Sequence, residues 1–252
     1  MKTKILIAAS VGVLVSSNAW AQATVKPDGQ WRSAGGLGFS ASSGNVKSSN
    51  LTINGDVVKM TAADKWQIYG NALRGSVGGN TTAELFKLGT RYDFNLNADY
   101  FAFGLADIER NKFANLGWRL SAGAGLGYHL IKSDPVTWDI FGGFGFASDH
   151  YIDTAFVADR NRNSYNRLEL LLGEESTHKL TATTAFRQRL VIYPNLSNGG
   201  HFRSTFDAGL SVAMSNTMSL GLTLGHRYNS DPGSGLKKSD LLLFTGVTGK
   251  FD

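Results

Sequence analysis

The sequence predicts an all-β protein, a transmembrane antiparallel up-and-down β-barrel of about 12 strands. The first observation is the stretch from Leu116 to Ile131, where apolar residues alternate with residues that are mostly small or polar. Such alternation predicts a strand with two different faces. The second is that the same pattern recurs along nearly all of the chain after residue 30. The third is that the one long apolar run, 5–15, is too short to cross a bilayer as a helix.

The first 21 residues are expected to form a cleaved signal peptide. Lys2 and Lys4 precede the apolar run, and the small residues Ala19 and Ala21 flank Trp20 at the positions that a signal peptidase reads. Cleavage after Ala21 would leave a short periplasmic leader at 22–30 and a barrel at 31–252. Loss of the two lysines would lower the formal charge from +5 to +3. An uncleaved amphipathic anchor is the alternative.

Composition excludes several classes of protein. The 252 residues include 30 glycines, 4 prolines and no cysteine, so no disulfide holds the fold. The mean hydropathy of −0.14 does not fit a helical membrane protein. Positive charges are scattered apart from Lys237-Lys238, which does not indicate nucleic-acid binding. The glycines at 123–127 lack the spacing and the following helix of a dinucleotide loop, so no cofactor is expected.

Each expected strand places its apolar side chains on one phase. The first runs from Trp31 to Ala41 and ends at the turn 42–45. The third is less regular because Arg74 falls on the apolar phase, and the fifth loses its phase at 107–109, which is either a bulge or the membrane exit. The expected strands are 31–41, 50–57, 65–77, 86–96, 100–109, 116–131, 136–146, 167–172, 180–192, 202–214, 218–229 and 240–251.

The connections alternate in length, as they should in a bacterial barrel with its N-terminus in the periplasm. Short periplasmic turns are expected at 61–64, 95–99, 132–135, 174–177 and 215–217. Longer outer loops are expected at 111–115, 148–163, 194–200 and 230–238. Aromatic residues at the strand ends predict a girdle at each interface. The expected girdle residues are Trp31, Trp66, Phe94, Tyr100, Tyr128, Trp138 and Phe251 at the periplasmic rim, and Trp118, Tyr193, Phe202 and Tyr228 at the other.

The inward phase carries charges of both signs, which must be paired or hydrated. If the strands around 194–200 pair symmetrically, Arg187 falls opposite Asp207 as a cross-strand ion pair. Twelve strands lie between barrels filled by side chains and barrels with an open channel, so a closed barrel and a narrow channel both remain open. The candidate lumen-lining residues are Lys87, Arg91, Arg119, Asp139, Arg187, Arg189, Asp207 and Arg227.

Three histidines have a chemical interpretation. His129 is expected opposite Asp139, as an acid–base dyad or, preferably, a structural pair. Ser121 lies about 27 Å away along the strand, too far to complete a triad. His150 lies with two aspartates in the longest outer loop, where a metal site is an alternative to a solvated loop. His226 shares the lipid-facing phase near the outer rim.

Several sequence blocks resemble the salt-induced outer-membrane protein family, which is YdiY-like and contains a domain of unknown function. The resemblance implies a Gram-negative outer-membrane protein of uncharacterised role, linked to salt stress and without catalytic residues. Two departures are Asn111, where the family has an acidic residue, and Asp252 after the terminal aromatic. The blocks are Ser43-Gly44-Asn45, Asp99-Tyr100-Phe101, Glu109-Arg110-Asn111-Lys112-Phe113, Gly123-Ala124-Gly125-Leu126-Gly127-Tyr128, Tyr228-Asn229-Ser230-Asp231-Pro232 and Lys238-Ser239-Asp240.

The sequence therefore predicts a non-enzymatic outer-membrane barrel that acts as a narrow passive pore or as a structural envelope component under salt or osmotic stress. Its expected partners are outer-membrane lipids, the barrel assembly machinery and small ions or solutes. One alternative is an outer-membrane lipid hydrolase that uses His226, although no serine and aspartate partners are evident in the sequence. Another is a soluble periplasmic β-protein with its apolar faces buried against each other.

Overall fold

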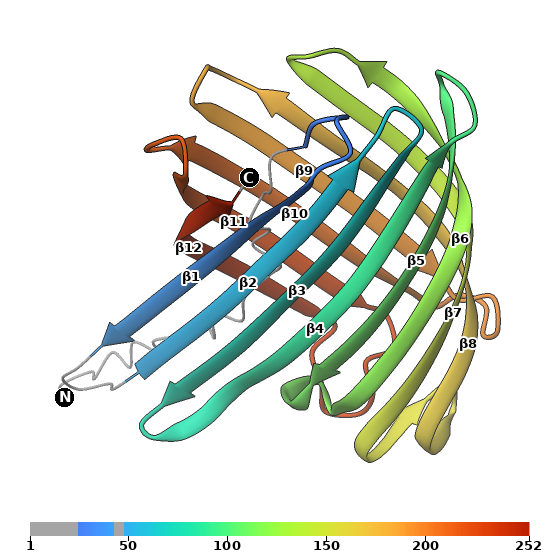
Figure 1. The fold of residues 1–252 in the computed structure, drawn as a ribbon. Coiled ribbons are helices and arrows are strands. Elements are labelled where there is room, and N and C mark those ends of the chain that lie inside the picture. The colour runs from blue at the N-terminus through green and yellow to red at the C-terminus, as the bar shows by residue number, and fades with distance from the viewer. Residues whose placement is uncertain (1–24, 43–47, 252) are drawn as a thin grey trace, which may run out of the picture.

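The computed structural model describes residues 25–42 and 48–251 and shows a closed antiparallel barrel. Every strand pairs with its neighbour in sequence, and β12 closes the barrel on β1 (Figure 1). The prediction of a 12-stranded up-and-down barrel is confirmed. The elements are β1 (Trp31–Ser42), β2 (Ser48–Met60), β3 (Asp64–Val77), β4 (Asn80–Asn95), β5 (Tyr100–Asn111), η1 (Lys112–Ala114), β6 (Leu116–Lys132), β7 (Val136–Val157), β8 (Arg160–Lys179), β9 (Thr184–Pro194), β10 (Phe202–Ala213), β11 (Met218–Asn229) and β12 (Ser239–Phe251).

The two faces of the sheet have opposite character. Large apolar side chains on the outer face are exposed, for example Leu37 at 63% and Phe144 at 67%. Polar side chains on the inner face are buried, including Asp56 and Arg167 at 5% each. A continuous exposed apolar band around a closed barrel fits a bilayer, since closure leaves no unpaired strand edge in the hydrocarbon. In the described residues, no helix is long and apolar enough to span a membrane.

The barrel has a terminal end, where β1 begins and β12 ends, and an opposite loop end (Figure 1). Aromatic pairs mark both rims of the apolar band. At the terminal end the rings of Trp31 and Trp66 lie 5.5 Å apart. At the loop end the rings of Phe202 and Tyr228 stack at 5.1 Å. Aromatic side chains at such heights are typical of the two interfaces of a membrane barrel.

The prediction of a long loop at 148–163 is wrong. β7 continues to Val157 and β8 begins at Arg160, so the connection is a turn of Ala158 and Asp159, with φ angles of 49° and 58°. Inward side chains of the extended hairpin form their own buried cluster, which includes Val157 and Tyr165. The alternation is hard to read from the sequence there, because polar residues occupy most outward positions and the ladder to β8 shifts register between His150 and Ala155.

The prediction of a turn at 174–177 is also wrong. β8 continues to Lys179, the turn comes at 180–183, and Glu175 lies within the strand. β5 keeps its alternation through 107–109, and the ladder to β6 shifts register only between Glu109 and Asn111. The expected signal peptide and most of the turn at 42–45 lie outside the described residues.

Candidate functional site in the barrel lumen

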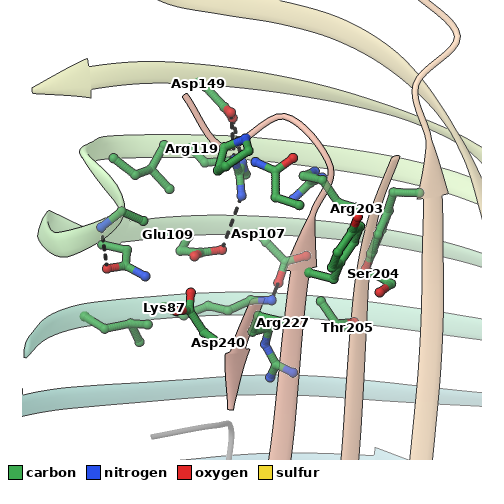
Figure 2. Close-up of a pocket in the computed structure, with 18 of the residues that line it drawn as sticks. Lys87, Asp107, Glu109, Arg119, Asp149, Arg203, Ser204, Thr205, Arg227 and Asp240 are labelled. Atoms are coloured by element: carbon green, nitrogen blue, oxygen red, sulfur yellow. Dashed lines mark hydrogen bonds and ion pairs between the residues drawn. The ribbon is translucent and has the colours of Figure 1, made fainter. Parts of the chain in front are cut away.

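A charge-lined cavity of about 230 Å³ occupies the loop-end half of the lumen (Figure 2). This volume holds on the order of ten water molecules, so charged groups at its wall can remain hydrated. Side chains from β3 to β7 and from β9 to β12 reach it, as does the connection between β11 and β12. Its described charged residues are Lys87, Arg119, Arg189, Arg203, Arg227, Lys237 and Lys238, with Asp107, Glu109, Asp149, Asp207 and Asp240.

Asp149 is the centre of the ion pairs on one wall of this cavity. Arg119 of β6 binds it in a bidentate manner, with Nε to Oδ1 at 2.5 Å and Nη2 to Oδ2 at 2.7 Å. Arg167 of β8 donates to the same carboxylate through Nη1 at 2.8 Å. Two guanidinium groups therefore share one buried carboxylate, and the charge-assisted bonds fix all three side chains. Figure 2 shows Arg119 between Asp149 and Glu109.

The chain of ion pairs continues onto β10. Arg167 Nε donates to Glu169 Oε1 at 2.7 Å, and Arg203 Nη2 donates to Glu169 Oε2 at 2.7 Å. At the other end, Arg119 Nη1 lies 4.0 Å from Glu109 Oε2. We call this set the ion ladder. Its members are Glu109, Arg119, Asp149, Arg167, Glu169 and Arg203.

Two further pairs face the cavity from other strands. Lys87 Nζ lies 3.4 Å from Asp107 Oδ1, and the Tyr69 hydroxyl donates to the same oxygen at 2.6 Å. Arg227 of β11 donates through Nη2 to Asp207 of β10 at 2.7 Å. The carboxylates are thus held by cations on neighbouring strands, while the cavity side of the cations stays open to water.

The predicted ion pair between Arg187 and Asp207 does not form. The ladder of β9 and β10 places Asp207 opposite Arg189 and Arg187 opposite Gly209, a shift of two residues from the expected register. The connection after Pro194 runs to His201, so the centre of the hairpin lies later than a symmetric pairing about 194–200 assumes. Arg187 instead pairs with Glu175.

Glu175 collects three arginines in the terminal-end half of the lumen. Besides Arg187, its carboxylate lies 3.6 Å from Arg189 Nε and 3.9 Å from Arg91 Nη1. Arg91 also donates through Nε to Asp93 at 2.6 Å. The sequence interpretation missed Glu175 because it lay in an expected turn. Its alternation with Glu169 and Leu171 along one strand was the available signal.

An apolar layer lies beside this cluster, and Arg189 reaches from the cluster to the cavity. Its buried members are at most 5% exposed. The Arg91 guanidinium lies 4.7 Å from the centre of the Phe141 ring and 5.1 Å from that of Phe103, which are cation–π distances. The layer consists of Phe101, Phe103, Phe141, Leu171 and Val191, with Leu105 and Tyr193 packed against it.

Glycines on neighbouring strands make room for two rings of the layer. Phe101 lies opposite Gly127, where an added Cβ would come within 2.1 Å of the ring. Phe141 lies opposite Gly173, where the corresponding distance is 2.4 Å. Each ring therefore lies flat over a glycine backbone, which only a residue without a side chain allows. Gly127 and Gly173 therefore do not open the lumen but make room for aromatic rings.

The eight candidate lumen residues all lie on the inner face, in three groups. Lys87, Arg119, Arg189, Asp207 and Arg227 border the cavity. Arg91 and Arg187 lie with Glu175 in the terminal-end half. The eighth residue, Asp139, pairs with His129.

His129 and Asp139 stand opposite each other, and His129 Nδ1 lies 2.7 Å from Asp139 Oδ1. The imidazole also packs against Phe101, with ring centres 4.9 Å apart. Asp149 points into the ion ladder, whereas His150 stacks on Trp118 on the outer face. The alternative metal site around His150 is therefore not assembled, and the described residues contain no group of three metal-ligating side chains.

The connection between β11 and β12, residues 230–238, covers part of the cavity mouth. Asp231 Oδ2 accepts a hydrogen bond at 2.8 Å from the backbone N–H of Ala158 at the tip of the β7–β8 hairpin. Gly233 adopts a φ of 99° close to Val157 of the same hairpin. Pro232 and Leu236 line the cavity. The connection thus folds inward and is held by the extended hairpin.

Known proteins resemble this chain to different extents. An uncharacterised protein of Escherichia coli (strain K12), YdiY, is 29% identical over 118 residues, which is 47% of each chain, so the match spans about half of that relative. An outer membrane channel from Pseudomonas putida F1 superimposes with a TM-score of 0.51 at 13% identity, over 90% of this chain and 97% of that one. The NanC porin gives 0.46 at 10% identity, over 87% and 97%.

At 13% identity, the Pseudomonas putida channel shows a shared barrel fold. The family evidence is stronger because it covers most of the described barrel. Residues 35–251 match one family over the strands that carry the ion ladder, the apolar layer and the β11–β12 connection. The chain therefore belongs to the family described as "Protein of unknown function, DUF481".

Proposed function

We propose that the protein is an outer-membrane barrel that acts as a narrow passive pore for small ions or polar solutes. The observation that carries this proposal is a closed barrel, apolar outside, around a hydrated cavity lined by charges. A signal peptide at 1–21 would export the chain to the barrel assembly machinery. The short turns of the terminal end would face the periplasm, and outer-membrane lipids would surround the apolar band.

The charges at the cavity favour anions. Its described lining has seven cationic and five anionic side chains, and the carboxylates are mostly engaged by arginines. Rings of cationic side chains select anions in membrane pores. Because the apolar layer fills part of the lumen below the cavity, the open path would be narrow, and large solutes would be excluded.

Single-channel recordings in planar bilayers test the pore. We expect discrete conductance steps and, in a salt gradient, a reversal potential that indicates a modest preference for anions. The double variant Arg187→Ser, Arg189→Ser should move the reversal potential toward cations, because it removes positive charge from the lumen. Arg227→Ser should shift the reversal potential in the same direction for the same reason. Lys179→Ser removes an exposed lysine in the terminal-end turns and is the control. A correctly folded barrel without steps would contradict the pore.

The resemblance to salt-induced proteins supports a role during salt or osmotic stress. We expect a deletion strain to grow more slowly than wild type at high NaCl, with rescue by the intact gene. Rescue by a variant that does not conduct would favour a structural envelope role over a pore. Equal growth of deletion and wild-type strains at high salt would contradict the stress role.

Lipid hydrolysis is the second candidate because the structure gives His226 a serine partner. His226 Nε2 lies 2.7 Å from Ser239 Oγ on the membrane-facing side near the loop end. A histidine at this distance can take the serine proton as the hydroxyl attacks an acyl ester. Among the described residues, no carboxylate accepts a hydrogen bond from the His226 ring, so the dyad lacks the usual orienting acid. Equal phospholipid hydrolysis by wild type and Ser239→Ala would exclude it.

A further inference from the structure

We propose that the outer surface of β1–β5 binds a lipid that carries a phosphate. The phosphate would lie between Arg74 and Arg110, and an acyl chain would lie in a groove over Gly35, Gly55 and Gly70. The site rests on the membrane location in the proposed function and is independent of conduction. Its ligand is a phosphate-bearing amphiphile of the leaflet at the loop end.

Three charged side chains project from the outer face where β3, β4 and β5 approach the loop end. Arg74 stands opposite Glu84 in the ladder of β3 and β4. Arg110 Nη2 lies 3.6 Å from Glu84 Oε1, and the Arg110 and Glu84 side chains are 55% and 40% exposed. No ion pair of Arg74 is found among the described residues. Glu84 is therefore paired with Arg110, and the charge of Arg74, opposite Glu84 in the ladder, leaves a net positive charge on this surface.

These charges adjoin the apolar band. On the same face of the adjoining strands, Phe86, Leu88 and Ile108 are 47%, 46% and 39% exposed. Arginines at the edge of the hydrocarbon extend toward the headgroups, where phosphates lie. A guanidinium binds a phosphate through two parallel hydrogen bonds, which gives it an advantage over lysine at this position. Arg74 and Arg110, which flank Glu84 from β3 and β5, could therefore contact one lipid phosphate from two sides.

An apolar groove of about 360 Å³ lies on the same side of the barrel. Its floor is a row of glycines in register, with Gly35 opposite Gly55 and Gly55 opposite Gly70. Because the row lacks side chains, the surface is hollow at this level of the band. Its walls include Val57, Ile68, Leu88 and Phe251.

The groove and the arginines are placed for a single ligand. Gly70 is four residues from Arg74 on β3, about 13 Å along the strand, and the outward position between them is Ala72. Because alanine has a small side chain, Ala72 does not block an acyl chain that runs along the surface from Arg74 to the groove. A headgroup at Arg74 would leave its acyl chain free to enter the groove, where apolar contact adds to the charge attraction.

The test measures lipid binding to the detergent-solubilised full barrel by native mass spectrometry, with lipid A, phosphatidylglycerol and inorganic phosphate as separate probes. We expect wild type to retain one lipid. The double variant Arg74→Ser, Arg110→Ser should bind at least about ten-fold more weakly, since hydrogen bonds to charged groups are each worth roughly a factor of ten. Arg160→Ser removes an exposed arginine at the β7–β8 turn and is the matched control.

Gly35→Leu tests the groove separately. The nearest atom to an added Cβ at Gly35 is 4.0 Å away, so leucine fills the groove without a backbone clash. It should weaken lipid binding and leave inorganic phosphate binding unchanged. Unchanged lipid binding in Gly35→Leu would overturn the acyl-chain groove and assign the arginines to free phosphate. Unchanged binding in the arginine double variant would overturn the whole site, and single-channel steps in that variant would show that the pore proposal survives.

Discussion

The two halves of the lumen are built from the same strands and differ in what their inward residues do. In the loop-end half, inward residues of β5 to β8 and of β10 form the ion ladder beside a charge-lined cavity. In the terminal-end half, inward residues of β5, β7, β8 and β9 form the apolar layer, which packs beside the ion pairs of Glu175. The alternation of the strands is the same in both. The identity of the cross-strand neighbour decides whether a stretch of lumen is wet or dry.

The difference assigns separate roles to the two halves. In the ion ladder, Asp149 and Glu169 each lie between two guanidinium groups, so this wall is held firmly by charge-assisted hydrogen bonds. In the apolar layer, rings seated on glycines leave little room for water. We therefore expect substitutions in the ion ladder to change stability and ion preference. Substitutions in the apolar layer should change the width of the path through the lumen.

The largest expected effect is at Asp149, which is 2% exposed. Asp149→Ala would leave Arg119 and Arg167 without their shared carboxylate and should cost about 3–5 kcal/mol of unfolding free energy. Urea unfolding of the refolded barrel, followed by tryptophan fluorescence, measures the loss. Asp134→Asn, at an exposed ion pair with Lys179, is the control and should unfold like wild type. A loss no larger than that of the control would contradict the ladder as a stabilising unit.

Truncation of a ring in the apolar layer should widen the path through the lumen. Phe141→Ala removes a ring beneath Arg91 and opens space over Gly173. The stability cost should be about 3 kcal/mol, at the low end for such a truncation because water can enter the space. Single-channel conductance should rise above wild type. Phe144→Ala, on the outer face of the same strand, is the control for an aromatic outside the lumen. Unchanged conductance in Phe141→Ala would place the narrowest point elsewhere.

A smaller effect is expected at the mouth. Asp231→Ala removes the hydrogen bond from Ala158 that holds the β11–β12 connection, at a cost of about 1 kcal/mol. Recordings should show more frequent fluctuations between conductance levels, because the connection lines the cavity and is less firmly held. Ser234→Ala, at an exposed position of the same connection, should record like wild type. Identical noise in both variants would mean that the connection does not limit flow.

The smallest effect is expected at the terminal end, outside both halves. Arg32 hydrogen bonds hold the pKa of the Asp28 carboxyl well below its usual range. This contribution to stability is present at pH values above the usual carboxyl pKa of about 4 and is lost as pH falls through the lowered value. The small difference between wild type and Asp28→Asn in urea unfolding should thus shrink at acidic pH. A difference that grows on acidification would reverse the assigned sign.

Local pattern predicted much of the barrel. The outward phase of Leu51, Ile53 and Val57 and the inward phase of Asp56 follow from alternation alone, and the structure places them so. The turn at 132–135 was found because its polar residues interrupt a strong pattern. The β7–β8 hairpin was missed because most of its outward residues are polar and its ladder shifts register between His150 and Ala155.

The sequence alone determined the period of two, and with it the closed barrel, its apolar exterior and the set of inward charges. The tertiary structure decided which charges meet. A shift of two residues between β9 and β10 keeps every side chain on its face, so no hydrophobic pattern reports it. Yet that shift moves Arg187 from Asp207 to Glu175. An ion pair forms only when two charged groups lie within a few ångströms of each other, whereas alternation specifies only the face on which each side chain lies. The ion pairs of the lumen therefore depend on strand register, which the alternation of apolar and polar residues does not specify.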